Sequence, residues 1–271
     1  MTIAFIGTGN MGGSLARAAA KAEENDLLLV NRHPEKAERL QKEIGGKVTT
    51  QEAAASEADI VFFGVKPNAL ADLCASVRRT IGDRAGNRDE SSDHPCPFVL
   101  VSMVAGARIE DLQGKLGAAY PVIRIMPNTP VSIGEGMILY SCSPEVTEEQ
   151  KNAFLHAMRN AGRFQPVEER LMEAGMAVSG CGPAFVDLFV EAMADAGVAG
   201  GLPRQTAVLL ASQTVMGAAK LILETGKHPG ELKDAVCSPG GTTIQGVRKL
   251  EEKGLRSAVI EAVLAAMNAS V

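Results

Sequence analysis

The sequence lacks several features that would place it in a specialised class of protein. It contains no tryptophan and only two tyrosines, and its net charge of -5 gives no electrostatic reason to bind nucleic acid or an anionic membrane. No uninterrupted apolar run reaches the roughly 18 residues that a membrane-spanning helix needs. The first residues lead directly into an apolar strand pattern, without the basic region and cleavage site of a signal peptide. We therefore expect a cytoplasmic protein with neither nucleic-acid nor membrane partners.

Disulfides and metal sites are not indicated either. The cysteines are odd in number and none forms a C-x-x-C pair, which predicts reduced thiols. The histidines show neither metal-ligand nor catalytic-triad spacing, so we expect no bound metal. The residues concerned are Cys74, Cys96, Cys142, Cys181 and Cys237, with His33, His94, His156 and His228.

Strand and helix patterns alternate over the first part of the chain, and only helical patterns follow. The 46% hydrophobic content can supply a substantial core. Alternation of this kind predicts a parallel, doubly wound α/β sheet of the Rossmann type. We expect this domain over residues 1–165 and an all-α domain over 166–271. A polar stretch over 82–97 predicts an exposed loop. Predicted strands are 2–6, 27–30, 48–50, 59–65, 98–102, 122–126 and 136–140; predicted helices are 14–22, 34–43, 52–56, 68–80, 109–116, 147–161, 171–177, 183–196, 203–224, 229–236, 243–253 and 255–269.

A glycine-rich turn follows the first predicted strand. Gly7, Gly9 and Gly12 form a G-x-G-x-x-G pattern between a strand and a helix, which is the context of a dinucleotide-binding loop. Gly7 permits the tight turn, Gly9 lets a pyrophosphate approach the backbone, and Gly12 lets the helix pack on the strand. The alternative is an ordinary tight turn between a strand and a helix.

The end of the second predicted strand indicates which dinucleotide binds. NAD-binding chains usually place a carboxylate there for the ribose 2′-hydroxyl, whereas this chain has Asn31 and Arg32. Arg32 can pair with a 2′-phosphate, so NADPH is favoured, with NADH as an alternative donor. The competing interpretation is that Arg32 is simply solvated. Lys66, at the end of another predicted strand, is a candidate for phosphate or ribose contact.

A second candidate site lies near the C-terminus. Ser238-Pro239-Gly240-Gly241-Thr242-Thr243 breaks the backbone and then opens a predicted helix. Unpaired N–H groups at such a point can bind an anion, and a threonine hydroxyl lies among them. The alternative is that Thr242 or Thr243 only caps the helix.

Taken together, these segments resemble the pyrroline-5-carboxylate reductase family over essentially the whole chain. The similar motifs are the opening 5–12, Val65-Lys66-Pro67, 101–106, Arg124-Ile125-Met126-Pro127-Asn128-Thr129-Pro130, 179–184, Gly201-Leu202-Pro203-Arg204 and the 238–243 run. The chain departs from the family pattern at Gly64, where Ala is usual, at Cys181, where Ser is usual, and at Met176, where Thr is common.

The resemblance implies NADPH-dependent reduction of 1-pyrroline-5-carboxylate, a cyclic imine, to L-proline. It implies substrate contacts at Glu169 and at the 238–243 loop, with backbone N–H groups of Gly240, Gly241 and Thr242 holding the carboxylate and the Thr243 hydroxyl at the imine nitrogen as the catalytic group. Glu169 has a second interpretation of equal weight, as a carboxylate that only favours a helix start. The implied cofactor contacts are Ile6, Gly7, Thr8, Gly9, Asn10, Met11, Gly12, Asn31, Arg32, Gln51 (in place of a usual Asn), Val65, Lys66, Pro67, Met103, Val104 and Ala105.

The resemblance also implies a homodimer built on the helical domain, with a decamer as a further assembly. Each active site would combine the cofactor domain of one subunit with the substrate loop of another. Two rival functions are a hydroxyacid dehydrogenase and a catalytically silent NADP-binding protein. The first normally needs a lysine early in the C-terminal domain, and none occurs between Lys151 and Lys220. The intact 238–243 loop argues against the second.

Overall fold

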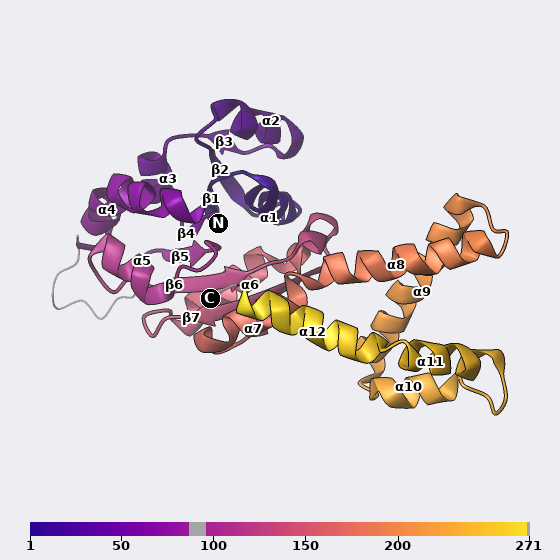
Figure 1. The fold of residues 1–271 in the computed structure, drawn as a ribbon. Coiled ribbons are helices and arrows are strands. Elements are labelled where there is room, and N and C mark those ends of the chain that lie inside the picture. Colours follow the sequence, from indigo (N-terminus) through magenta and orange to yellow (C-terminus); the bar gives the residue numbers. More distant parts are fainter. Residues whose placement is uncertain (87–95, 270–271) are drawn as a thin grey trace. The chain divides into compact units, whose positions relative to one another are not determined.

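A computed structural model describes residues 1–86 and 96–269 of the chain (Figure 1). These residues form two compact units, one over residues 1–180 and the other over 181–269.

The first unit is built on an eight-stranded sheet in the order β3-β2-β1-β4-β5-β6-β7-β8. All neighbouring strands are parallel except β6 and β7, which are antiparallel. This confirms the predicted doubly wound α/β sheet. The strands are β1 (Thr2–Ile6), β2 (Asp26–Val30), β3 (Lys47–Val48), β4 (Ile60–Phe63), β5 (Val99–Ser102), β6 (Val122–Met126), β7 (Gly136–Cys142) and β8 (Gly162–Pro166).

Helices cover both faces of this sheet, because successive strand side chains point to opposite sides. On one face, Ile3 and Phe5 pack in a core with residues of α1, α2 and α6. On the other, Ala4 and Ile6 pack with residues of α3, α4 and α5 (Figure 1). The helices are α1 (Asn10–Ala20), α2 (Pro34–Ile44), α3 (Gln51–Glu57), α4 (Leu70–Gly86), α5 (Ile109–Leu116), α6 (Glu148–Ala157) and α7 (Met172–Ser179).

The prediction of a loop over 82–97 is wrong at its start. Helix α4 continues to Gly86, because Ile81 is fully buried and Arg84 donates hydrogen bonds to the carbonyls of Ala55 (2.9 Å) and Ala58 (2.6 Å). Apolar burial and these two bonds stabilise the helix beyond residue 80, where the prediction ended it. Residues 87–95 of the predicted loop lie outside the described part of the chain.

Strand β8 was not predicted, and the predicted helix over 147–161 is shorter than expected. Its capping box is confirmed, because Thr147 and Gln150 exchange hydrogen bonds of 3.1 and 3.0 Å. The helix then ends at Ala157, a short 3₁₀ turn follows, and Gly162, with φ +133°, starts a strand parallel to β7. The strand sequence is Gly-Arg-Phe-Gln-Pro, with a glycine and a proline at its ends and no run of β-branched residues. Its low strand propensity explains why the sequence did not predict a strand here.

The first compact unit extends to Gly180 and therefore includes α7. A side chain at Gly175 would collide with Leu139 of β7, so this helix packs directly on the sheet. The functional boundary after residue 165 stays a prediction.

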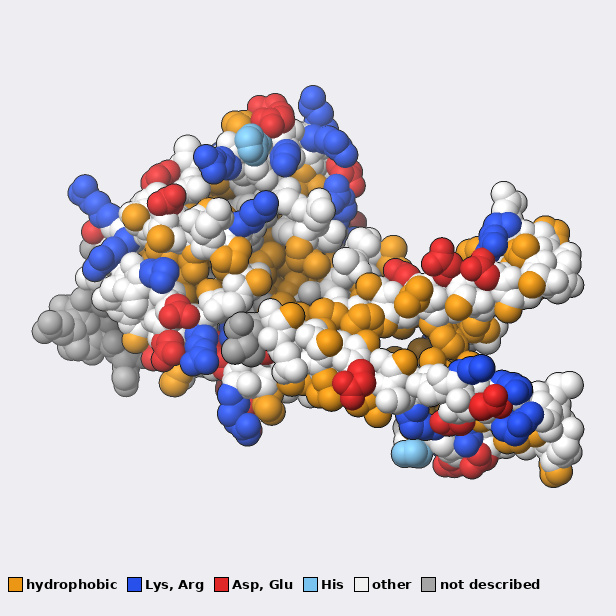
Figure 2. All heavy atoms as spheres, in the orientation of Figure 1, with side chains coloured by type: hydrophobic (Ala, Val, Ile, Leu, Met, Phe, Trp, Pro, Cys, Tyr) orange, Lys and Arg blue, Asp and Glu red, His pale blue; other side chains and the backbone are white. Residues whose placement is uncertain are grey.

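The second unit consists of helices alone, as the sequence predicts. They are α8 (Gly182–Ala199), α9 (Arg204–Thr225), α10 (Pro229–Ala235), α11 (Thr242–Glu252) and α12 (Leu255–Asn268). Its core of buried residues is small and formed by Ala194, Ala207 and Ala211 of α8 and α9. Large apolar side chains are instead exposed along these helices, for example Leu188 at 67% and Leu209 at 66%. The orange side chains in Figure 2 show this surface over the second unit.

When hydropathy is averaged along the helices of the described residues, two stretches are long and apolar enough to cross a membrane. They are Glu169–Ala199 and Arg204–Thr225. Length and composition alone qualify them, and this is weak evidence for a membrane span.

Candidate active site

The glycine loop has the geometry that its pattern predicts. Gly7 has φ +111°, and a Cβ there would collide with the carbonyl of Gly64. A Cβ on Gly12 would collide with the carbonyl of Gly7, whereas one on Gly9 would meet no described atom within 4 Å. Two of the glycines are therefore required by close backbone packing, and the third leaves open space above the loop.

Helix α1 begins at this open point. Gly9 is its N-cap, and no side chain of the described residues caps its first N–H groups. Such a helix start, with space in front of it, fits the pyrophosphate of a dinucleotide. Asn31, directly after β2, donates a hydrogen bond to the Thr8 hydroxyl (2.9 Å) and so links the predicted ribose-binding segment to the loop.

The carboxyl ends of three strands bring further predicted cofactor residues to the same edge of the sheet. The ends of β1, β4 and β5 lie in register, because Ile6 pairs with Phe63, which pairs with Ser102. The segments that follow, Gly64 to Pro67 and Met103 to Ala105, therefore lie beside the glycine loop. A Cβ on Gly64 would approach the Met103 sulfur to 3.3 Å, so these two turns are in close contact.

Three of the predicted cofactor residues differ in what their side chains contact. Val104 is buried in the core, so only its backbone can reach a cofactor. Gln51, at the start of α3, accepts a hydrogen bond from the Ser76 hydroxyl (2.5 Å). Arg32 is exposed after β2. The contacts of all three with a dinucleotide stay predictions.

Glu169, a predicted substrate contact, also forms hydrogen bonds within the protein. Its Oε1 accepts hydrogen bonds from the backbone N–H of Ile109 (2.8 Å) and from Arg124 (3.2 Å). Arg124 also donates to Glu173 (2.6 Å), and its Nε is buried with no hydrogen-bond partner among the described residues. The same glutamate therefore supports the start of α5, whereas the sequence predicted a structural role only at the start of the helix that follows Glu169.

Arg124 is the residue that the sequence interpretation missed. It lies 3% exposed in the otherwise apolar strand β6, and it balances two partly exposed carboxylates. A single arginine within a buried strand is itself the signal, because a charge is retained there only with partners.

The predicted substrate loop lies at the start of α11 in the second unit. Gly240 has φ +69°, and Gly241 donates to the Ser238 carbonyl (3.0 Å), which closes the turn. Gly241 is the N-cap, and within the described residues no side chain caps the helix. Thr242 and Thr243 are thus the first two residues of α11, both exposed. The capping interpretation is wrong, because neither threonine occupies the cap position.

This turn also changes which donors can hold an anion. The Gly241 N–H is already used within the turn, while the N–H groups of the first helical residues have no intrahelical acceptor. Thr242 and Thr243 supply them.

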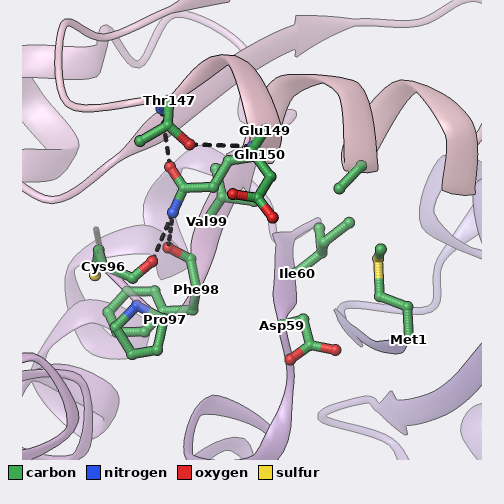
Figure 3. A pocket seen from close by; sticks show the side chains of 11 residues that line it. Met1, Asp59, Ile60, Cys96, Pro97, Phe98, Val99, Thr147, Glu149 and Gln150 are labelled. Atoms are coloured by element: carbon green, nitrogen blue, oxygen red, sulfur yellow. Dashed lines mark hydrogen bonds between the residues drawn. The ribbon is translucent and has the colours of Figure 1, made fainter. Parts of the chain in front are cut away.

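A separate hollow of about 240 Å³ lies at the opposite edge of the sheet, where β1, β4 and β5 begin (Figure 3). Gln150 projects there and donates to the carbonyls of Cys96 (2.7 Å) and Phe98 (3.1 Å). These bonds tie α6 to the start of β5, so the polar side chain in this hollow has a structural role. The hollow lies at the edge of the sheet opposite the glycine loop.

Metal and thiol chemistry have little support in the described part of the chain. Residues 1–86 and 96–269 contain no group of three His, Cys, Asp or Glu side chains that could hold a metal ion. Burial raises the pKa of the Cys74 thiol to about 11 and also raises the pKa of Cys142, so both thiols stay protonated near neutral pH.

Comparison with known proteins gives the same family over the full chain. The family model described as pyrroline-5-carboxylate reductase dimerisation matches residues 169–271. A second model, described as NADP oxidoreductase coenzyme F420-dependent, matches residues 2–85. Pyrroline-5-carboxylate reductase of Escherichia coli is 39% identical over 99% of this chain and 96% of its own length. The chain belongs to the pyrroline-5-carboxylate reductase family.

Other pyrroline-5-carboxylate reductases extend the similarity to distant organisms and to solved structures. The enzyme of Glycine max is 38% identical over 99% of this chain and 94% of its own length. The structure from Coxiella burnetii matches with a TM-score of 0.86 at 32% identity, covering 99% of this chain and 96% of that one. The Plasmodium falciparum structure, which has NADP bound, matches with a TM-score of 0.84 at 28% identity, covering 100% and 97%.

Proposed function

We propose that the chain catalyses the NAD(P)H-dependent reduction of pyrroline-5-carboxylate to proline. The observation that carries this proposal is the start of α11, where a Pro-Gly-Gly turn leaves uncapped N–H groups and an exposed hydroxyl. An anionic substrate with a reducible C=N bond in its ring needs those two features together, one for the carboxylate and one for the ring nitrogen. The full-length similarity to named reductases supports the same reaction.

Different residues of this loop bind different groups of the substrate. The N–H groups of Thr242 and Thr243 bind the carboxylate at the positive end of the α11 dipole. The Thr243 hydroxyl hydrogen-bonds the ring nitrogen and assists proton transfer at that nitrogen as the imine becomes an amine. Ser238 and Gly240 shape the turn that sets this geometry.

The glycine loop and its neighbours hold the dinucleotide. The start of α1 binds the pyrophosphate, with Gly9 allowing close approach. When bound, the nicotinamide supplies the hydride for the imine carbon. Segments 65–67 and 103–105 position it, and Arg32 favours NADPH over NADH.

Glu169 acts in this proposal as both a support and a substrate contact. One of its oxygens is used by Ile109 and Arg124, and the other is available to a substrate. Arg124 fixes the orientation of that carboxylate through its fork of donors.

Self-association covers the apolar faces of the helical unit. Exposed leucines on α8 and α9 exceed what a monomer normally leaves in water, and the matching family model describes dimerisation. We infer a homodimer through this unit, with further assembly to a decamer, and a cytoplasmic location. A second copy, rather than lipid, is then the partner of the two long apolar stretches.

One assay separates this function from its rivals. The purified protein is incubated with NADPH and pyrroline-5-carboxylate, and in parallel with 3-hydroxy acids and NADP⁺ or NAD⁺. We expect oxidation of NADPH only with the imine. Turnover of a hydroxy acid, or turnover of neither substrate, would refute the proposal.

A further inference from the structure

Two motifs of the sequence, 124–130 and 179–184, are joined by one buried side chain. Asn128 lies in the first motif, shortly after β6, and is 9% exposed. Its Nδ2 donates a hydrogen bond of 2.9 Å to the backbone carbonyl of Ser179, which is the last residue of α7 and the first residue of the second motif. The function proposed above uses neither residue, so this bond calls for an explanation of its own.

The orientation of the Asn128 amide is fixed at both of its ends. Its Oδ1 accepts a hydrogen bond of 2.8 Å from the backbone N–H of Met137 in β7. Because an N–H can bond only the amide oxygen and a carbonyl can bond only the amide nitrogen, these two partners exclude the flipped amide. Asn128 is therefore held by the sheet and directs its donor at the end of α7.

The Ser179 carbonyl needs a donor from outside its own helix. The last carbonyls of an α-helix lack intrahelical partners, and a helix that continued through this point would offer Ser179 the N–H of residue 183. That residue is Pro183, in the first turn of α8, and proline has no N–H. The Asn128 amide takes the place of the missing donor.

The bonded carbonyl lies where one compact unit ends and the other begins. The first unit extends to Gly180, and the second starts at Cys181. These two residues alone separate α7 from α8, and both have right-handed helical backbone angles. The Gly180 N–H donates to the carbonyl of Met176 (2.7 Å). The course of the chain from α7 into α8 therefore depends on the few hydrogen bonds of this short junction.

We propose that Asn128 is a positioning residue for catalysis, which fixes the junction between α7 and α8 and so sets the helical unit for turnover. This role rests on the proposed function, in which the glycine loop of the first unit and a 238–243 loop of the second unit act on one substrate, whichever subunit supplies that loop. A misplacement of about 1 Å between reacting groups can cost on the order of 100-fold in rate. The hydrogen bonds of Asn128 reach neither loop, so it acts through the junction.

Two matched substitutions test this role in the full-length protein. Asn128→Asp keeps the acceptor oxygen of the side chain and loses only the donor. Asn25→Asp is the control, because the Asn25 amide also donates to carbonyls of the first unit, those of Ala19 (2.9 Å) and Ala157 (3.1 Å), near the ends of α1 and α6. The measurements are kcat with saturating NADPH and pyrroline-5-carboxylate, the dissociation constant of NADPH, and the melting temperature.

A further variant tests whether the Ser179 carbonyl is the partner that matters. Pro183→Ala restores an N–H four residues after Ser179, and this N–H can bond the carbonyl in helical geometry. Asn128→Asp should therefore lower the melting temperature less in the Pro183→Ala background than in the wild type. An equal fall in both backgrounds would overturn the proposal, because the bond to Ser179 would then not be what Asn128 contributes.

We expect Asn128→Asp to lower kcat about 10-fold to 100-fold while the dissociation constant of NADPH changes less than about twofold. Asn25→Asp should lower the melting temperature but keep kcat within about twofold of the wild type. An unchanged kcat in Asn128→Asp, or equal losses of kcat in the two variants, would overturn the proposal, because the amide would then serve stability alone. A parallel loss of NADPH binding would overturn it by placing Asn128 at the cofactor. A wild-type chain without turnover would instead refute the proposed function, and the melting temperatures would still test the junction bond.

Discussion

Thr243 is the single side chain on which the proposed chemistry depends most. It is the second residue of α11 and is exposed, and it makes no capping bond among the described residues. Thr243→Ala should lower kcat by roughly 10-fold to 1000-fold, the range of general acid–base contributions, while Thr243→Ser should retain most activity. Steady-state kinetics measure this, with Thr225→Ala as a control at another exposed helical threonine. An unchanged kcat for Thr243→Ala would remove that role from the hydroxyl.

An added methyl group should affect two glycines of the first loop differently, by weakening cofactor binding at one and lowering stability at the other. Gly9→Ala meets open space, and its φ of -74° suits alanine, so stability should change by less than about 1 kcal/mol while NADPH binding weakens about tenfold. Gly12→Ala places its Cβ against the Gly7 carbonyl and should cost about 1–3 kcal/mol of stability. Thermal unfolding and cofactor titration separate the two effects. A strongly destabilised Gly9→Ala, or a stable Gly12→Ala, would contradict the loop geometry.

At the scale of elements, Glu24 connects the segment after α1 to the end of α6. Its carboxylate lies 2.7 Å from Arg159 and 3.1 Å from His156, and the Arg159 hydrogen bond, helped by a backbone hydrogen bond, lowers the pKa of Glu24 from 4.5 to about 2. A depressed carboxyl pKa stabilises the fold above the unfolded value of about 4.5, and this stabilisation is lost as the pH falls toward 2.

Glu24→Gln should therefore flatten the fall in melting temperature between about pH 5 and pH 2. Melting curves over this range measure the change, and Glu23→Gln is the neighbouring control. If the melting temperature of Glu24→Gln falls with pH as steeply as that of the wild type, the Glu24 contact does not contribute to stability in this range.

The regular elements were predictable because their periodicity is strong. Strand 122–126 and helix 109–116 have the predicted bounds, and the glycine loop follows its expected strand. The failures occur where tertiary contacts override local composition. Strand β8 forms because β7 offers it a pairing edge, and α4 is lengthened by Arg84 bonds to a neighbouring helix end.

The candidate site was predictable to the same extent. Motifs located the loops, but the ion pairs of Arg124 and the bond from Asn128 to the Ser179 carbonyl join residues that are far apart in the sequence. No local pattern reports which carbonyl a distant side-chain amide reaches. The use of the Gly241 N–H inside its own turn is likewise visible only in three dimensions.

At the scale of the whole molecule, the exposed apolar faces of α8 and α9 predict that function depends on self-association. Burying a leucine side chain in the interface stabilises the dimer by about 1.5–3 kcal/mol. In a symmetric dimer each substitution occurs twice, once in each subunit. Leu188→Glu or Leu209→Glu should raise the dimer dissociation constant at least about 100-fold. Sedimentation velocity measures this, with Leu188→Met as an apolar control. A dimer that survives both charged variants would place the interface elsewhere.

The chain reduces a cyclic imine by hydride transfer, and the fate of the transferred hydrogen tests this directly. The most direct measurement uses NADPH carrying deuterium at the transferred position of the nicotinamide, with unlabelled pyrroline-5-carboxylate and the purified wild-type chain. Mass spectrometry and NMR of the product locate the label. We predict proline in an amount equal to the NADPH consumed, with one deuterium on the ring carbon next to nitrogen and remote from the carboxylate. Unlabelled proline, or NADPH consumption without proline, would contradict it.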